Sequence, residues 1–234
     1  MRARYVMPVT LMLLPGLLCD HRLWQYQLPH FADARVADLT RDDTIPAMAA
    51  RTLVAAPKRF ALAGLSMGGY VAFEILRQAP ERVTHLALFA TSARADEAAA
   101  VRRRKGLIGL VRQHRFLGVS RRLLPSLLHP DNLTNQPLCE LVVRMAADLG
   151  REVYLRQQAA ILARPESRES LEALRIPALI GAGAADQTTP PDRGREIADL
   201  IPGAEFQLFE RSGHLPPLEE PDAVTQAIEN ILRR

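Results

Sequence analysis

Short apolar runs alternate with longer amphipathic stretches along most of this chain. Six runs have the length of a strand, at residues 9–14, 34–39, 60–65, 82–90, 177–181 and 205–209. Strands of a parallel sheet are covered on both faces, so they read as nearly continuous apolar runs. Stretches with helical spacing separate these runs. The pattern therefore predicts an α/β fold, with a mostly parallel sheet of about six strands and helices on both faces.

Capping residues indicate where the helices between these strands begin. Thr44 is a good N-cap for a helix that has Pro46 in its first turn. Another helix is expected to start at Ser66, directly after the run at 60–65. Further helices are expected to begin at Trp24 and Pro221 and to span residues 191–200.

Residues 96–173 interrupt the alternation of strands and helices. Apolar residues in this segment recur at helical spacing and no strand-like run occurs; examples are Leu107, Leu110, Val111, Leu141, Val142 and Met145. We therefore expect a helical cap (lid) over residues 96–173. It would be inserted between two strands of an α/β core formed by residues 1–95 and 174–234.

The composition argues against several classes of protein. Of the 234 residues, 48% are apolar and 24% are charged, which is ordinary for a globular chain. Cys19 and Cys139 are too few for a disulfide framework, which favours a reducing, cytoplasmic location. No nucleic-acid motif accompanies the net charge of +4. No cluster of His, Cys and carboxylate residues has the spacing of a metal site, so neither a metal nor a cofactor is expected.

The candidate chemistry centres on Gly64-Leu65-Ser66-Met67-Gly68. Glycines two residues before and after Ser66 permit a sharp turn from strand to helix, where larger side chains would meet neighbouring backbone. The turn lifts the serine hydroxyl above the sheet, and the helix N-terminus behind it favours developing negative charge. Glycine-rich turns also occur for packing reasons alone, so the motif needs support from the rest of the chain.

Two further loops follow predicted strands and carry candidate partners for the serine. Asp186 lies in the loop after the run at 177–181, and His214 lies after the last strand. The carboxyl ends of parallel strands meet at one edge of a sheet, so these loops should converge on Ser66. A neutral imidazole would take the serine proton, and Asp186 would orient that imidazole. Singly, Asp186 could cap a helix and His214 could lie on the surface, but the order Ser, Asp, His favours a catalytic triad.

These motifs resemble those of α/β-hydrolase-fold serine hydrolases, in particular small lidded carboxylesterases similar to pimeloyl-carrier-protein methyl ester esterases. The matching segments are residues 64–69, 183–191 and 213–221. The resemblance implies that Ser66 is the nucleophile, Asp186 the triad acid and His214 the base. It also implies an oxyanion hole formed by the backbone N–H groups of Leu17 and Met67.

The N-terminal region departs from that family in two ways. Pro15-Gly16 stands where the family often has His-Gly; glycine is the sterically demanding member of the pair, so we expect the oxyanion hole to form. An N-terminal antiparallel hairpin common in the family is expected to be absent. Arg2, Arg4 and the apolar stretch after them imitate a signal peptide. We favour a buried strand there, because cleavage would remove half of the oxyanion hole. No apolar run is long enough to span a membrane.

The resemblance implies a serine hydrolase that cleaves carboxylic esters of small molecules through an acyl-enzyme on Ser66. An esterase for carrier-bound acyl groups, a lactonase, a carbon–carbon bond hydrolase and a perhydrolase use the same triad, so they remain alternatives. Epoxide hydrolases and dehalogenases of this fold carry Asp where this chain has Ser66, and they are disfavoured. A non-catalytic ligand-binding protein is the least favoured alternative, because it would have less need of all three groups.

The cap segment is unusually basic. No acidic residue occurs between Ala98 and Pro130. Such a run is often a solvated helix face, but it would also suit docking of an acidic partner, such as an acyl-carrier protein, or of an anionic substrate. The basic residues concerned are Arg102, Arg103, Arg104, Lys105, Arg112, Arg115, Arg121 and Arg122.

Overall fold

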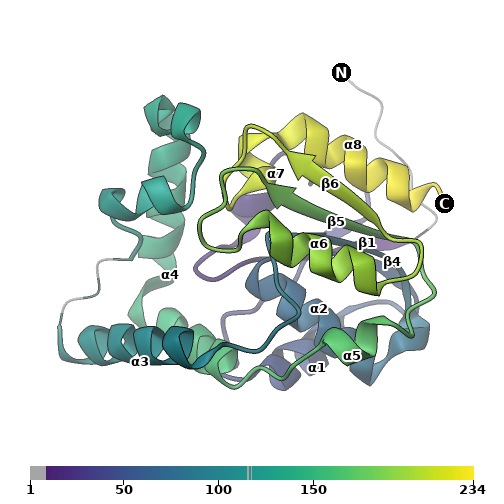
Figure 1. The fold of residues 1–234 in the computed structure, drawn as a ribbon, viewed down its shortest axis with the longest axis horizontal. Helices are drawn as coiled ribbons and strands as arrows, with labels where there is room; N and C mark the ends of the chain where they lie inside the picture. The colour runs from purple at the N-terminus through teal and green to yellow at the C-terminus, as the bar shows by residue number, and fades with distance from the viewer. Residues whose placement is uncertain (1–8, 115, 117) are drawn as a thin grey trace.

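The predicted α/β architecture is confirmed by a computed structural model, which describes residues 9–114, 116 and 118–234. Its strands form one sheet in the order β2-β1-β3-β4-β5-β6, and all the described neighbours pair in parallel (Figure 1). The order reverses between β1 and β3, which opens a crevice at their carboxyl ends. The strands are β1 Thr10–Leu14, β2 Ala34–Val36, β3 Phe60–Leu65, β4 Val83–Phe89, β5 Ala178–Gly183 and β6 Glu205–Phe209.

Helices cover both faces of this sheet (Figure 1). Met12 and Leu14 of β1 belong to the apolar cluster shared with α1, α2 and α6, whereas Leu11 and Leu13 pack with Trp24 and α8. Successive strand residues point to opposite faces, so a strand covered on both sides must be apolar throughout. The elements concerned are η1 His21–Trp24, α1 Ile45–Ala55, α2 Met67–Gln78, α6 Pro191–Leu200 and α8 Pro221–Leu232.

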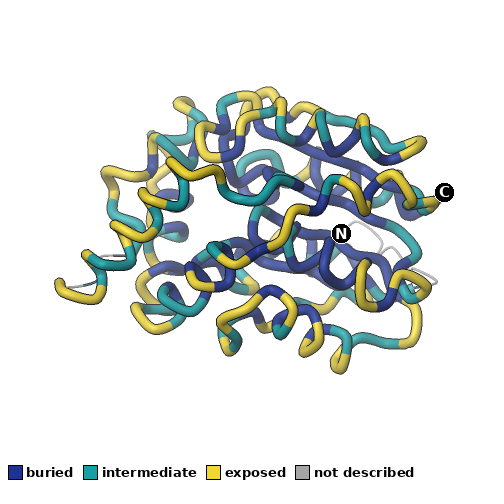
Figure 2. The backbone as a smooth tube through the Cα atoms, turned by 60° about the horizontal axis from the view of Figure 1, so that its bottom comes forward, coloured by how far each residue is buried: buried dark blue, intermediate teal, exposed yellow. Residues whose placement is uncertain are grey.

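Between β4 and β5 the chain is helical, and we refer to residues 96–173 as the cap. It comprises α3 Ala98–Gln113, η3 Arg121–Ser126, η4 Pro130–Thr134, α4 Gln136–Leu162 and α5 Arg168–Leu171. Gly150, with φ of 75°, interrupts α4. Figure 1 shows α3 and α4 beside the body that carries the sheet, and Figure 2 shows how much of the outer cap is exposed. No described residue of α3 is buried, so this helix does not pack into the core.

Two predicted elements differ most from the structure. The helix expected at Trp24 is instead the 3-10 turn η1, which starts where the Asp20 carboxylate accepts the backbone N–H of Arg22. The second strand ends at Val36 rather than at residue 39. It stops early because Leu39 leaves the sheet edge, and its carbonyl accepts a hydrogen bond from Gln157 of the cap at 3.1 Å.

Short elements complete the path of the chain. They are η2 Pro80–Arg82, which connects α2 to β4, and α7 Pro216–Glu219, which precedes α8. None of the helices in residues 9–114 and 118–234 combines the length and apolarity needed to cross a membrane. Arg2 and Arg4, which prompted the signal-peptide alternative, lie outside the described residues, as does Arg115.

Candidate active site

Ser66 occupies the sharp turn between β3 and α2 with strained backbone geometry. Its φ is 53° and its ψ is −110°, a region that residues with a Cβ rarely adopt. Two hydrogen bonds hold the turn: the Ser66 N–H donates to the Phe89 carbonyl at 2.9 Å, and the Thr91 hydroxyl donates to the Ser66 carbonyl at 2.8 Å. A Cβ on Gly68 would lie 2.2 Å from the Leu14 carbonyl oxygen, so only glycine fits there. The strain is thus imposed by the surrounding sheet.

Asp186 lies in the loop after β5, and its carboxylate is fully enclosed. The Oδ1 atom accepts the backbone N–H groups of Thr188 and Thr189, both at 2.8 Å. The Oδ2 atom lies 2.8 Å from Nδ1 of His214, with the side chains 0% and 8% exposed respectively. The loop itself holds the carboxylate, leaving one oxygen aimed at the imidazole.

His214 follows β6 in a loop that the cap helps to fix. Its backbone N–H donates to the Leu127 carbonyl at 2.7 Å. One oxygen of the Glu219 carboxylate accepts the N–H groups on either side of the histidine, from Gly213 and Leu215, while the other accepts the N–H of His129 in the cap. Burial raises the pKa of Glu219, and these N–H donors oppose that rise. Glu219 therefore ties the histidine loop to the cap.

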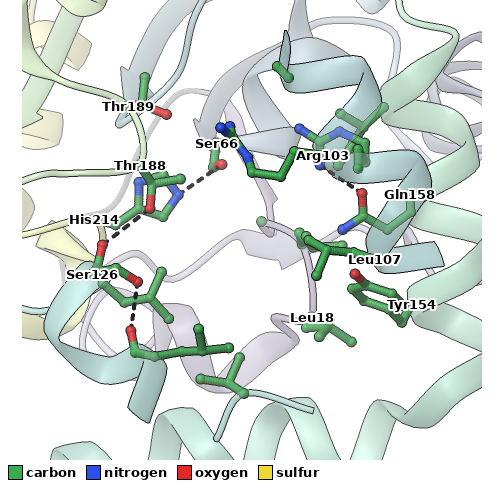
Figure 3. A pocket seen from close by; sticks show the side chains of 18 of the residues that line it. Leu18, Ser66, Arg103, Leu107, Ser126, Tyr154, Gln158, Thr188, Thr189 and His214 are labelled. Carbon is green, nitrogen blue, oxygen red and sulfur yellow. Dashed lines mark hydrogen bonds between the residues drawn. The ribbon is translucent and has the colours of Figure 1, made fainter. Parts of the chain in front are cut away.

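The three side chains predicted from the sequence lie in hydrogen-bond contact. Nε2 of His214 is 3.0 Å from Oγ of Ser66 (Figure 3), while its Nδ1 faces Asp186. They come from the carboxyl ends of β3, β5 and β6, which meet at one edge of the sheet. This arrangement can move a proton from the serine hydroxyl to the imidazole.

The loop after β1 passes directly beside the serine. A Cβ on Gly16 would lie 3.6 Å from that of Ser66. The Leu17 N–H makes no hydrogen bond among the described residues, whereas the N–H of Leu18 is fixed by Oε1 of Gln157 at 2.9 Å. Met67 is the first residue of α2, and N–H groups in a first helical turn lack intrahelical partners. Two N–H donors near Ser66 are thus without hydrogen-bond partners among the described residues, and their role as an oxyanion hole stays a prediction.

A cavity of about 840 Å³ opens at Ser66 and His214, between the sheet edge and the cap (Figure 3). Part of its wall is apolar, from Leu107, Leu110, Val111, Leu123, Val142 and Met145, and part is basic, from Arg94, Arg103, Arg104, Arg164 and Arg193. Cavities of this size accommodate small organic ligands. The cap therefore supplies a chamber in which a molecule with an apolar part can reach the serine.

This geometry agrees with a comparison of the chain with known protein families. The model of the alpha/beta hydrolase family matches residues 5–227. The chain belongs to this family. The resemblance read from the serine turn and the two loops is thereby confirmed.

Among curated members of the alpha/beta hydrolase family, 3-oxoadipate enol-lactonase 2 of Acinetobacter baylyi is 28% identical over 174 residues, covering 73% of this chain and 62% of that protein. Pimeloyl-[acyl-carrier protein] methyl ester esterase of Aromatoleum aromaticum is 28% identical over 215 residues, covering 82% of each. Among solved structures, a thermophilic esterase from Thermogutta terrifontis superposes with a TM-score of 0.87 at 29% identity, covering 97% of this chain and 90% of that one.

Several residues at this hydrolase-family site were not predicted from the sequence. Gln157, fully buried on α4, has no local motif that would mark it, and Glu219 lies in a segment that resembles the family but has no predicted role of its own. Cys19 lines the cavity, and burial raises its pKa to about 12, so its thiol stays protonated and is a poor nucleophile. The described residues contain no group of three or more His, Cys, Asp and Glu side chains arranged to hold a metal ion.

Proposed function

We propose that this protein is a serine hydrolase that cleaves carboxylic esters, with Ser66 as nucleophile, His214 as general base and Asp186 as the group that orients the imidazole. The observation that carries the proposal is the continuous hydrogen-bonded series from Oγ of Ser66 through both imidazole nitrogens to the buried carboxylate. Family membership supports it, because esterases and a lactonase are among the relatives.

The first half of the reaction forms an acyl-enzyme. Oγ of Ser66 attacks the ester carbonyl carbon while Nε2 of His214 takes the hydroxyl proton. The negative charge that develops on the carbonyl oxygen is stabilised by the N–H groups of Leu17 and Met67; loss of one such donor typically costs about 10² to 10³ in rate. The tetrahedral intermediate collapses, and the imidazolium gives its proton to the departing alcohol.

The second half releases the acid. Nε2 of His214 takes a proton from a water molecule, whose oxygen attacks the acyl carbon on Ser66. The new tetrahedral intermediate uses the same two N–H donors, and its collapse returns the proton from the imidazolium to Oγ. Throughout, Asp186 keeps Nδ1 protonated and stabilises the imidazolium.

A fluorophosphonate probe tests the nucleophile directly. The probe should label the wild type and Ser126→Ala, a variant of another serine that lines the cavity, but not Ser66→Ala. Hydrolysis of p-nitrophenyl butyrate should follow the same pattern, with similar melting temperatures for all three proteins. Turnover by Ser66→Ala above a few per cent of wild type would overturn the assignment.

A second candidate is an esterase for acyl groups carried on an acidic protein. Arg102, Arg121 and Arg122 are exposed on the cap, and one relative is named for a carrier-bound ester. Attraction between an arginine face and an acidic partner speeds association and is screened beyond about 8 Å at physiological salt. Changing Arg121 and Arg122 to Glu should therefore raise KM for an acyl-carrier ester, in a salt-dependent way, without lowering kcat for p-nitrophenyl butyrate. Equal, salt-insensitive kinetics would contradict docking.

A further inference from the structure

We infer that the cavity takes esters whose far end carries a carboxylate, and that Arg103 binds this carboxylate. The inference rests on the proposed ester hydrolysis at Ser66 and adds the class of substrate. It concerns a small anionic ester inside the cavity and not a protein docked on the cap, although Arg103 is itself an exposed residue of the cavity wall.

The cavity wall has an excess of positive charge. Five arginines line it, against two acidic residues, Asp96 and Glu97. An apolar chamber with this charge excess favours a ligand that is itself partly anionic.

Four of the five arginines already have acidic partners. Arg104 and Arg164 share the carboxylate of Asp96, at 2.9 and 2.7 Å. Arg94 pairs with Glu196 at 2.8 Å, and Arg193 lies 3.8 Å from the carboxylate of its neighbour Asp192. These contacts hold the guanidinium groups to the protein, and the three carboxylates offset part of the charge of the four arginines.

Arg103 differs from the other four. Within residues 9–114, 116 and 118–234, its guanidinium has no hydrogen bond and no ion pair with any other residue. It stands four residues before Leu107 on α3, so both side chains lie on the helix face that lines the cavity. In Figure 3, Arg103 and Leu107 border the same cavity as Ser66. Its neighbour Arg102 is not among the lining residues.

The chemistry of arginine selects the ligand. The guanidinium presents a planar fork of N–H donors that matches the two oxygens of a carboxylate, and such charge-assisted pairs are stronger than neutral hydrogen bonds. An ester with its carbonyl at Ser66 could lay an apolar stem along Leu107 and present a terminal carboxylate to Arg103. Half-esters of straight-chain dicarboxylic acids have this constitution.

A matched pair of esters tests this inference. Monomethyl adipate and methyl hexanoate have the same chain between the ester and the far end, where a carboxylate replaces a methyl group. We expect wild type to prefer monomethyl adipate, measured as the ratio of the two kcat/KM values in a pH-stat assay. In Arg103→Gln this ratio should fall roughly tenfold, the size of one charge-assisted hydrogen bond. In Arg102→Gln, which removes the same charge one residue away, the ratio should stay at the wild-type value.

A binding measurement separates this inference from the proposed reaction. Monomethyl adipate should bind the inactive Ser66→Ala protein in calorimetry, and about tenfold more weakly when Arg103→Gln is added. This result would support the carboxylate site even if wild type hydrolysed neither ester. Absence of hydrolysis would instead contradict the proposed esterase activity. An unchanged ratio in Arg103→Gln, an equal fall in Arg102→Gln, or equal binding to the single and double variants would overturn the inference.

Discussion

Gly183→Ala should separate the carboxylate of Asp186 from the imidazole of His214 without altering either residue. Gly183 ends β5, and it passes so close to the histidine loop that an added Cβ would lie 1.9 Å from the carbonyl oxygen of Gly213. Real Cβ atoms essentially never come within 3.0 Å of another atom in this way. The obstacle is backbone and cannot rotate aside. The two loops must therefore separate by roughly 1.1 Å, the difference between these distances.

The separation falls on the hydrogen bond between Asp186 and His214, because both residues lie just beyond the point of contact. That bond measures 2.8 Å. Stretched by the same amount it would reach about 3.9 Å, which is no longer a hydrogen bond. A misplacement of about 1 Å in a catalytic site can cost about 10²-fold in rate. We expect kcat/KM for p-nitrophenyl butyrate to fall by about that factor.

Gly194→Ala is the matched control. Its added Cβ would have its nearest contact with the Phe206 side chain, at 3.2 Å, so a small shift of that ring accommodates it. Steady-state kinetics and thermal unfolding of both variants separate loss of geometry from loss of fold. In a double-mutant cycle, Asp186→Asn should cost less in the Gly183→Ala background than in wild type, because the bond is already broken. Activity above a third of wild type, or full additivity in that cycle, would refute the reasoning.

Four other substitutions probe the active site and its surroundings. His214→Ala should reduce kcat/KM for p-nitrophenyl butyrate as far as loss of the nucleophile does, and Asp186→Asn should reduce it somewhat less. Near wild-type activity in His214→Ala would contradict a histidine base. Gln157→Leu leaves the N–H of Leu18 without its partner, so we expect a loss of about 1–3 kcal/mol in unfolding free energy and a lower kcat. An unchanged kcat would exclude a role for Gln157 in shaping the loop after β1 for catalysis. Burial raises the pKa of Asp96, but its partners Arg164 and Arg104 lower it by more, so the pKa lies below the usual 3.8. The ion pairs of Asp96 therefore stabilise the fold at pH values above 3.8. The difference in Tm between wild type and Asp96→Asn should persist at pH 5 and shrink only as the pH falls below 3.8; a difference that shrank between pH 7 and 5 would contradict this.

Local sequence patterns predict much of the fold. The bounds of α6 and β6 were predicted to the residue, because prolines and a sharp change of apolar pattern mark them. Thr44 caps α1 as expected, accepting the N–H of Ala47 at 3.3 Å. The serine turn could be predicted as well, because Gly64 and Gly68 are required by the close approach of neighbouring backbone.

Contacts between distant segments could not be predicted in this way. The second strand was predicted too long because the pattern up to Leu39 is apolar, and only the tertiary structure brings Gln157 to its carbonyl. The same is true of the basic run in the cap. In the sequence, Arg103 and Arg104 look equivalent. In the structure Arg104 is paired with Asp96, whereas Arg103 faces the cavity without a partner among the described residues.

The sequence by itself determined the class of fold, the order of its strands along the chain, and the three side chains that meet at the sheet edge. These follow from short-range patterns and from the rule that the carboxyl ends of parallel strands converge. Only the tertiary structure decided how the cap closes over Ser66 and which charges in it are neutralised. Those properties depend on contacts between segments that are more than a hundred residues apart in the chain. One example is the hydrogen bond that the N–H of Leu18 donates to Gln157, and no local sequence pattern predicts such a contact.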